Sequence, residues 1–451
     1  MDPLPLSTIA ELCGGTVTPG SESLVVSSIS KDTRTIARGD LYLALRGANF
    51  DGNEFVEKAA AAGAAAAIVD RDITAPEGFA LIRVQDGQAA LEKLAAEWRD
   101  RLTARVVAIT GSSGKTSTKE FTAAVLSSRL KVTSTVGNLN NHIGLPLTIL
   151  RASQSDQAAV WEIGMNHPGE IAPLAKLARP DAGIITNIGI AHIEFFENRD
   201  GIATEKSELA RMVHPDGAVI FPAEDDYASY IAERATNRRL IRCGLGMADV
   251  TATNLEQTST GTAFTIRAFG ESAPTEIAIP GEHMVRNALL AVAAGLDFGL
   301  SLEECAEGLR RARLSGGRLE QKTIRGVRFL DDSYNANPDS MTAALRTLRS
   351  MAANGRRIAV LGRMGELGAH AEDGYRRVGK TVAESAQALI AVGPETAPLR
   401  DEAAAAGLHE IHEVETPREA AQVLRNIVHE GDIVLVKGSR AARMETVIGE
   451  F

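Results

Sequence analysis

The chain has 451 residues, of which 24% are charged and 44% are hydrophobic, a composition typical of folded globular proteins that excludes a mainly disordered chain. At about 100–200 residues per domain, this length predicts two to four domains. The 48 Lys and Arg residues against 58 Asp and Glu residues give a net charge of −10, which argues against a protein that binds nucleic acid regardless of sequence.

Cysteine usage and the first residues bear on the compartment. Cys13, Cys243 and Cys305 are scattered and form no CxxC pair, so neither a disulfide framework nor a cysteine zinc site is predicted. The start, MDPLPLSTIAEL, lacks the basic and apolar regions of a signal peptide. The longest apolar run, residues 59–69, is too short to span a membrane. We therefore expect a cytoplasmic protein without membrane or nucleic-acid partners.

Strand-like runs alternate with alanine-rich helical runs in the first part of the chain. A helix is expected over Glu54–Ala62, ended by Gly63, then a buried strand over Ala64–Val69. Apolar residues recur every three or four positions in Ala89–Trp98, which predicts another helix. We assign these elements to a first domain, residues 1–103.

The next part has the pattern of a parallel sheet. Val- and Ile-rich runs at residues 106–110, 159–164, 183–188 and 218–222 alternate with helical segments, which is typical of strands buried on both faces. Thr-rich alternation over residues 249–279 predicts a small antiparallel insert before a helix that starts near His283. These elements form the second expected domain, residues 104–316.

A second series of alternating strands and helices follows Arg318. Strands are expected at residues 327–330, 358–362, 388–393 and 433–437, which predicts a doubly wound, Rossmann-like domain over residues 317–451. The expected fold class is therefore α/β, with three domains and a mostly parallel central sheet.

The segment TGSSGKT, from Thr110 to Thr116, lies directly between a predicted strand and a predicted helix. Its glycines would let backbone N–H groups face a phosphate at the helix N-terminus. Lys115 would neutralise phosphate oxygens, and the Thr116 hydroxyl would bind Mg²⁺. Ile109 stands where the general GxxxxGK[ST] motif has glycine, so the loop is a GxxGKT variant. The alternative is an ordinary Gly-Ser turn before an amphipathic helix.

Four further polar residues or runs are candidates for chemistry. Glu162 and His192 follow strands of the same predicted sheet, where ligands of a hard cation are commonly placed; the alternative is solvated or internally satisfied side chains. Lys206, in the run EKSE, is a surface charge by pattern alone. The run DDSYNANPD, residues 331–339, follows a strand of the last domain and suits a binding edge; the alternative is an Asx-rich turn with a helix cap at Asp339.

Taken together, these segments resemble the Mur ligase family. The matching segments run in order from Asp32 to Arg440: DTR, GDLYLALRG, TGSSGKTSTKE, GNLNNHIGLP, EIGMNHPGEI, NIGIAHIE, EKSEL, GEHMVRNALLAVAA, GRLE, DDSYNANPDSM and KGSR. The run SYNANP is similar to that of the family member that adds D-alanyl-D-alanine.

The resemblance implies an ADP-forming, ATP-dependent peptide ligase that acts with Mg²⁺. ATP would phosphorylate the terminal carboxylate of UDP-N-acetylmuramoyl-tripeptide, and the amine of D-alanyl-D-alanine would then displace phosphate, giving the pentapeptide precursor of peptidoglycan. The third residue of the tripeptide stays open, and a monomer is expected. The alternatives are a sibling ligase that adds a single amino acid and a non-catalytic nucleotide-binding protein.

Residue roles carried over by the resemblance fall into three groups. For ATP they are the loop and its surroundings: Thr110, Gly111, Ser112, Ser113, Gly114, Lys115, Thr116, Ser117, Asn287, Arg318 and Asp332. For catalysis and Mg²⁺ they are Lys115, Thr116, Glu162, His192 and a carbamylated Lys206. For the substrates they are Thr33, Arg34 and Asn49 on the uridine diphosphate, Asn140 and Asn141 on the muramoyl side, and Tyr334, Asn335 and Asn337 on D-alanyl-D-alanine.

Two positions depart from the family pattern. Met284 replaces an asparagine after the histidine of GEHM, and Arg363 replaces an aspartate in LGRMGELG. The second departure bears on contacts to the acceptor.

Overall fold

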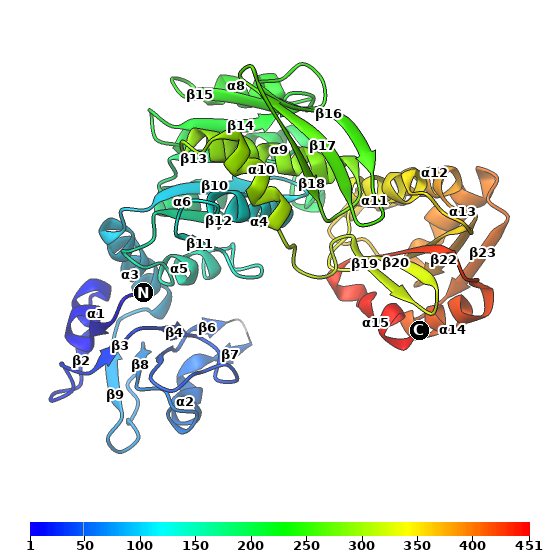
Figure 1. The fold of residues 1–451 in the computed structure, drawn as a ribbon. Helices are drawn as coiled ribbons and strands as arrows, with labels where there is room; N and C mark the ends of the chain where they lie inside the picture. Colours follow the sequence, from blue (N-terminus) through cyan, green and yellow to red (C-terminus); the bar gives the residue numbers. More distant parts are fainter. Residues whose placement is uncertain (48) are drawn as a thin grey trace. The chain divides into compact units, whose positions relative to one another are not determined.

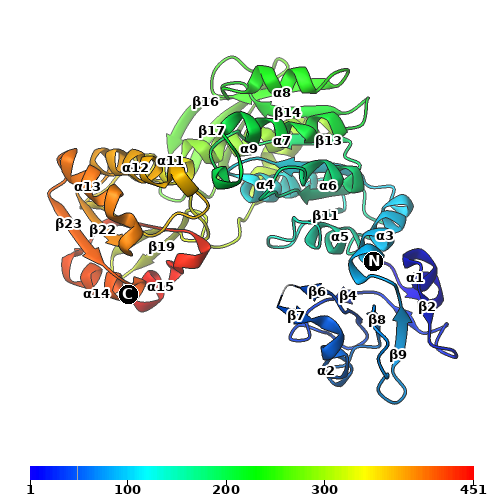
Figure 2. The same cartoon turned by 180° about the vertical axis from the view of Figure 1, so that it is seen from behind.

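A computed structural model describes residues 1–47 and 49–451. Contacts within the chain group it into two compact units. The first unit comprises Met1–Ala108, Leu130–Gly164 and Ala172–Asp181, and the second comprises Ile109–Arg129, Met165–Ile171 and Ala182–Phe451. Figures 1 and 2 show the elements from opposite sides.

The start of the first unit is built on a five-stranded sheet. Its order is β2 (Thr16–Val17), β9 (Ala80–Arg83), β8 (Ala66–Val69), β5 (Leu41–Leu43) and β4 (Ile29–Ser30), parallel except for β2. Its helices are α1 (Leu6–Cys13), α2 (Val56–Ala61) and α3 (Gly87–Arg101). Two short antiparallel pairs join β1 (Leu4–Pro5) to β3 (Val25–Val26) and β6 (Arg46–Gly47) to β7 (Phe50–Asp51).

Both predicted helices of this region form, with different bounds. The turn η1 (Gly52–Phe55) precedes α2, because the Asp51 carboxylate accepts a 2.9 Å hydrogen bond from Asn53 N and closes a tight 3₁₀ turn there. Helix α3 starts at Gly87, two residues earlier than expected, because Asp86 caps it through a 2.8 Å bond from Ala89 N.

The remainder of the first unit leads into the central domain. Strands β11 (Val132–Ser134) and β12 (Ala158–Glu162) pair in parallel. The neighbouring elements are β10 (Arg105–Thr110), α5 (Gly144–Ile149) and α6 (Ile171–Ala178). Strand β10 contains the predicted strand 106–110.

The second unit contains a mixed sheet followed by a doubly wound one. In the mixed sheet, β13 (Ala182–Ile185), β14 (Ala218–Pro222), β15 (Arg239–Gly244) and β16 (Val250–Gln257) run parallel, and β17 (Thr262–Ala268) and β18 (Glu271–Ile277) are antiparallel. This confirms the predicted antiparallel insert. Its helices are α4 (Lys115–Leu126), α7 (Arg199–Met212), α8 (Ala228–Arg234), α9 (Glu282–Asp297) and α10 (Leu302–Arg311), with the turn η2 (Ile193–Phe195).

The C-terminal sheet has the order β19 (Glu320–Ile324), β20 (Val327–Asp332), β24 (Ile433–Lys437), β21 (Arg357–Leu361), β22 (Ala388–Val392) and β23 (Glu410–Val414). All pairs are parallel except β19 with β20. Helices α11 (Pro338–Ser350), α12 (Ala371–Ser385) and α13 (Ala397–Ala405) cover one face, and α14 (Pro417–Ile427) and α15 (Glu445–Glu450) cover the other (Figures 1 and 2). Short turns are η3 (Gly368–His370), η4 (Pro394–Thr396) and η5 (Arg440–Ala442). The predicted Rossmann-like arrangement and the α/β class are confirmed.

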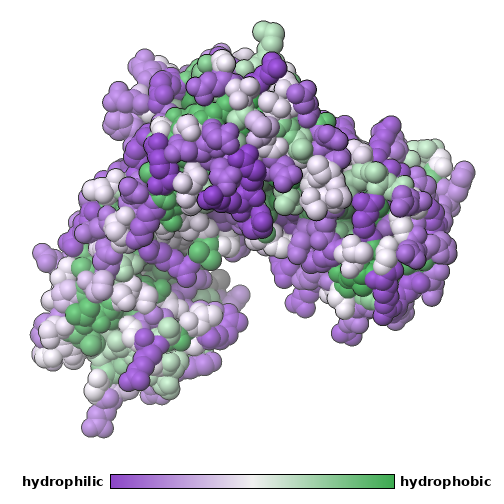
Figure 3. Space-filling view, viewed as in Figure 1, coloured by the Kyte–Doolittle hydropathy of each residue, from purple (hydrophilic) through white to green (hydrophobic). Residues whose placement is uncertain are grey.

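The surface shown in Figure 3 is mostly hydrophilic, and the three cysteines are buried. No helix among the described residues is long and apolar enough to cross a bilayer. Hydrophilic residues cover most of the face in Figure 3, with hydrophobic ones in scattered patches. Cys13, Cys243 and Cys305 are free and buried, and burial raises the pKa of all three thiols, that of Cys305 to about 12.

Candidate active site

The glycine-rich loop adopts a backbone that side chains would obstruct. Gly111 has φ +147°, and a Cβ there would lie 1.9 Å from Thr186 Oγ1. Gly114 has φ +79° at the start of α4, and a Cβ there would lie 2.7 Å from Asn287 Oδ1. Contacts therefore require glycine at both positions. Asn287 lies beside the loop, and its role in ATP binding stays a prediction.

Residues after β13 fix the loop. Asn187 accepts hydrogen bonds from Ser112 N at its carbonyl (3.0 Å) and from Ser113 N at Oδ1 (2.8 Å). Thr186 Oγ1 donates to the Ser113 carbonyl (2.5 Å). Strand β13 ends at Ile185, earlier than the predicted residue 188, because the chain turns here to hold the loop. The role of Asn187 was not predicted from the sequence.

Lys115 lies over the loop. Its Nζ donates a 2.7 Å hydrogen bond to the Gly111 carbonyl, and α4 begins at Lys115. The first turn of a helix directs backbone N–H groups toward such a loop. A lysine and a helix N-terminus therefore lie together at the loop, and anion binding there stays a prediction.

We expect a Gly111→Ala variant to be strongly destabilised or inactive. The added methyl group would overlap Thr186 Oγ1, and φ +147° is unfavourable for alanine. Thermal unfolding should show this loss of stability. Gly407→Ala is the control, because Gly407 also has a positive φ but a Cβ there would have nothing within 4 Å. It should lose only the smaller stability that comes from backbone strain. Equal unfolding temperatures for the two variants would contradict the steric argument.

His192 is paired with a carboxylate of the C-terminal domain. It has φ +64°, and its Nδ1 lies 2.5 Å from Glu366 Oε2. The hydrogen bond to His192 lowers the pKa of Glu366, and the nearby charge of Lys115 lowers it further. A carboxylate on one imidazole nitrogen orients the ring and leaves Nε2 for a ligand. Glu366 was not predicted as a site residue.

Lys206 is almost completely buried in α7, with 1% of its surface exposed. No described residue forms a hydrogen bond or ion pair with it. Burial lowers the pKa of this amine well below its usual value, and the positive charge of Lys115 lowers it further. The surface-charge alternative is therefore wrong. Its neighbour Glu205 instead accepts from Gly169 N and Ile171 N (2.8 and 2.7 Å).

The predicted ribose and phosphate residues lie near the first two strands of the C-terminal sheet. Asp332 accepts from Lys437 Nζ at one oxygen (2.5 Å) and from Leu319 N at the other (3.2 Å). The Arg318 guanidinium stacks on the Tyr334 ring, 3.9 Å from its centroid. Arg318 and Tyr334, predicted for different ligands, are thus direct neighbours.

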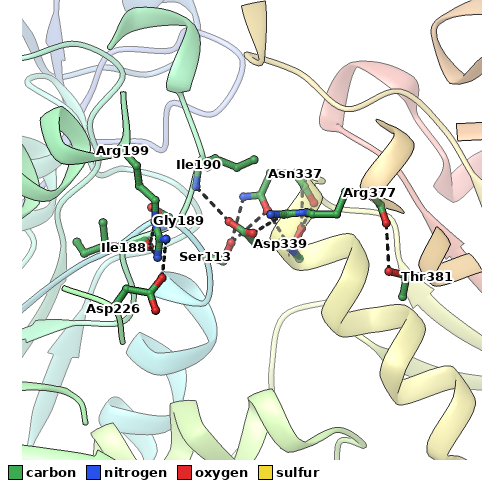
Figure 4. Close-up of polar contacts among 12 residues, drawn as sticks. Ser113, Ile188, Gly189, Ile190, Arg199, Asp226, Asn337, Asp339, Arg377 and Thr381 are labelled. Carbon is green, nitrogen blue, oxygen red and sulfur yellow. Dashed lines mark hydrogen bonds and ion pairs between the residues drawn. The ribbon is translucent and has the colours of Figure 1, made fainter. Parts of the chain in front are cut away.

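The asparagines of the SYNANP run differ in their surroundings. Asn337 caps α11, with Oδ1 accepting from Ser340 N (2.8 Å) and Nδ2 donating to Ser113 Oγ (3.0 Å; Figure 4). Asn335 is exposed, and its Oδ1 accepts from Ala336 N (2.9 Å). Asn337 therefore contacts the phosphate loop directly, and its assignment to the acceptor stays a prediction.

In the first unit, the predicted residues are held by local contacts. Glu162 is 2% exposed, and its Oε1 accepts from Asn140 Nδ2 (2.8 Å). Asn141 closes a turn before α5 by accepting from Gly144 N (2.9 Å). The residues predicted for the uridine diphosphate lie in the first sheet region. Arg34 forms an ion pair with Asp32 and lowers the pKa of that carboxyl group. Thr33 lies between these two residues in the chain, and Asn49 is exposed in the turn before β7.

The two departures from the family pattern occupy different surroundings. Met284 is buried, and its Sδ lies 3.9 Å from Asn287 Nδ2. Arg363 is half exposed and lies 3.6 Å from Glu395, while its carbonyl accepts from Ser439 N (2.8 Å). Met284 therefore touches a predicted ATP residue, and Arg363 forms a salt bridge within the C-terminal domain.

No cluster of three or more His, Cys, Asp or Glu side chains suited to a metal ion exists in the part of the chain that the structure describes. Mg²⁺ is commonly held by one or two carboxylates together with substrate phosphates, without a complete protein cage. A buried carboxylate at Glu162 and a hydroxyl at Thr116 are oxygen donors of the kind that Mg²⁺ prefers.

A glycine-rich loop between a strand and a helix, with a lysine over it, defines a P-loop nucleotide-binding protein of the α/β class. Profiles of the Mur ligase middle domain, the Mur ligase glutamate ligase domain and the Mur ligase family catalytic domain match residues 109–295, 317–440 and 25–99. The chain belongs to the Mur ligase family.

Named relatives cover nearly the whole chain. The UDP-N-acetylmuramoyl-tripeptide–D-alanyl-D-alanine ligase of Escherichia coli (strain K12) is 37% identical, over 98% of this chain and 97% of its own. A crystal structure of MurF from Acinetobacter baumannii has a TM-score of 0.89 and 34% identity, covering 100% and 99%. MurF ligase from Thermotoga maritima in complex with ADP has a TM-score of 0.83 and 27% identity, covering 94% and 97%.

Proposed function

We propose that this chain is the ATP-dependent ligase that joins D-alanyl-D-alanine to UDP-N-acetylmuramoyl-tripeptide. The observation that carries the proposal is the 37% identity, over 98% of the chain, to an Escherichia coli enzyme of that name. The ADP complex of the Thermotoga maritima relative supports ATP as the second substrate. The product is the UDP-muramoyl pentapeptide, a peptidoglycan precursor.

The reaction proceeds in two steps. The terminal carboxylate of the tripeptide attacks the γ-phosphorus of ATP, and ADP leaves, which gives an acyl phosphate. The amine of D-alanyl-D-alanine then attacks the acyl carbon, phosphate leaves and the amine loses a proton. A carboxylate is a poor electrophile, so phosphorylation supplies the leaving group; the enzyme chiefly positions the reactants and neutralises phosphate charge.

The phosphate loop and its lysine perform that neutralisation. Lys115 moves from the Gly111 carbonyl to the β- and γ-phosphate oxygens, while the loop Thr110–Ser117 and the start of α4 surround them. Asn287 contacts the adenine, Asp332 the ribose, and Arg318 the phosphates. Thr116 and Glu162 would hold one Mg²⁺ and His192 a second. Mg²⁺ there supplies charge neutralisation of the phosphates.

Lys206 acts as a carbamate. Because burial and Lys115 lower its pKa, the unprotonated amine that attacks CO₂ is readily available. The new N–C bond gives an N-carboxylate, and one proton is released. The buried site then contains an anion. The positive charge of Lys115 stabilises this anion, whereas it would repel the ammonium form of Lys206.

Substrate selection is divided along the chain. Thr33, Arg34 and Asn49 bind the uridine diphosphate, Asn140 and Asn141 the muramoyl part, and Tyr334, Asn335 and Asn337 the acceptor dipeptide. The domains that carry these roles are residues 1–103, 104–316 and 317–451. We place the enzyme in the cytoplasm as a monomer.

The proposal is tested by coupled ADP release with UDP-muramoyl tripeptide and a panel of acceptors. D-alanyl-D-alanine should support turnover, and single amino acids should give little. The readout separates the two alternative classes, since a sibling ligase would prefer a single amino acid and a non-catalytic protein would release no acceptor-dependent phosphate. Either of those results would contradict the proposal.

A further inference from the structure

The loop that carries His192 is held from two domains. Up to Gly189 it is fixed by the central domain: Arg199 donates to the Ile188 carbonyl (2.7 and 2.9 Å), Asp225 accepts from Ile188 N (2.9 Å), and Ser112 Oγ accepts from Gly189 N (2.9 Å). Beyond that point the C-terminal domain contacts it, because Asp339 Oδ2 accepts from Ile190 N (3.1 Å; Figure 4).

Asp339 fits closely against this loop. A Cβ at Gly189 would lie 2.3 Å from Asp339 Oδ2, so only glycine allows the carboxylate to approach. The other oxygen of Asp339 accepts from Arg377 of α12 (2.5 Å), whose carbonyl in turn accepts from Thr381 Oγ1 (3.2 Å). One oxygen of the Asp339 carboxylate therefore accepts from the central domain, and the other accepts from the C-terminal domain.

The same turn of α11 also contacts the phosphate loop. Asn337, two residues before Asp339, donates to Ser113 Oγ, and further along the chain Glu366 pairs with the His192 ring. The C-terminal domain thus touches the phosphate loop, the backbone before His192 and its imidazole.

We propose that Asp339 is a positioning residue that couples docking of the C-terminal domain to the placement of His192. When α11 is docked, the N–H of Ile190 is fixed two residues from His192, and the ring meets Glu366. When α11 is undocked, the segment after Gly189 loses the hydrogen bond from Ile190 N to Asp339. This inference rests on the role proposed above for His192. The competing explanation is that Asp339 only adds negative charge to the first turn of α11.

Two variants and one control separate these explanations. Asp339→Ala removes the acceptor and the charge, whereas Asp339→Asn removes the charge but keeps an amide oxygen that can accept from Ile190 N. Asp373→Asn is the control, because Asp373 is an exposed acidic residue in the first turn of α12 in the same domain.

The first readout is hydrogen exchange of the full-length, nucleotide-free protein over residues 187–196. Loss of a hydrogen bond to a charged acceptor should raise the exchange of Ile190 N by about 10-fold or more in Asp339→Ala. Asp339→Asn should show a smaller increase and Asp373→Asn none. This readout does not depend on activity. It therefore tests the hydrogen bond between Ile190 N and Asp339 even if D-alanyl-D-alanine is not the substrate.

The second readout is steady-state ADP release. Asp339→Ala should lower kcat by about 10- to 100-fold, with a smaller change in KM for ATP, and Asp339→Asn should retain more activity. Wild-type exchange at Ile190 in Asp339→Ala would overturn the proposal. Equal effects of Ala and Asn on both readouts would also overturn it, because a charge-only role predicts that result.

Discussion

Lys115→Ala should lose acceptor-dependent ADP release by about 10²–10³-fold or more, the range found when one charge-stabilising donor is removed from an active site. The side chain is half-buried and contacts the Gly111 carbonyl, so its methylenes contribute little to an apolar core. Its ammonium is the cation that the loop presents to phosphate. We therefore expect the variant to fold normally and to fail in catalysis.

The measurement pairs ADP release with thermal unfolding. Lys380→Ala, at an exposed lysine of α12, is the matched control and should keep both properties. An unfolding temperature near that of the wild type, with turnover lost, supports the assignment. Wild-type ADP release from Lys115→Ala would remove the phosphate-loop role.

Lys206→Arg should abolish most turnover, because a guanidinium cannot carry a carbamate and would place a permanent cation in a buried site next to the positive charge of Lys115. Burial lowers the pKa of Lys206 and so disfavours its ammonium form, whereas lowering the pH favours the ammonium over the carbamate. Activity should therefore depend on bicarbonate and decrease as the pH is lowered. Lys206→Glu should exceed Lys206→Arg in activity.

Chemical rescue makes this prediction specific. Short carboxylic acids should restore part of the activity of Lys206→Ala by occupying the vacated volume with an anion, and should not rescue Lys115→Ala. Mass spectrometry of the native enzyme under CO₂ tests for the added carboxylate. A fully active Lys206→Arg enzyme would contradict carbamylation.

The strands that could be predicted are the ones buried on both faces. Every residue of β22 and β24 is buried, and their continuous apolar runs indicate a parallel sheet. Strands β19 and β23 were not predicted. They lie at the two edges of the C-terminal sheet, and their sequences, EQKTI and EIHEV, are polar because one side meets water.

The phosphate loop was predictable because its groups are adjacent in sequence. Asn187, Asp339 and Glu366 were not assigned roles, although each makes a direct contact with a predicted site segment. Their partners lie far away in the chain, so no local pattern connects them. Lys206 was also ambiguous from pattern alone, since only the fold shows that this lysine is buried.

The inert thiols make this protein suitable for site-directed labelling. Cys13, Cys243 and Cys305 are buried, and their raised pKa values disfavour the thiolate that reacts with maleimides. A cysteine introduced at an exposed position such as Met247, which is 99% exposed, would react far faster than the native three. Fluorophore pairs can therefore be attached without first deleting native cysteines, and distances between labelled positions can be followed in an otherwise unaltered enzyme.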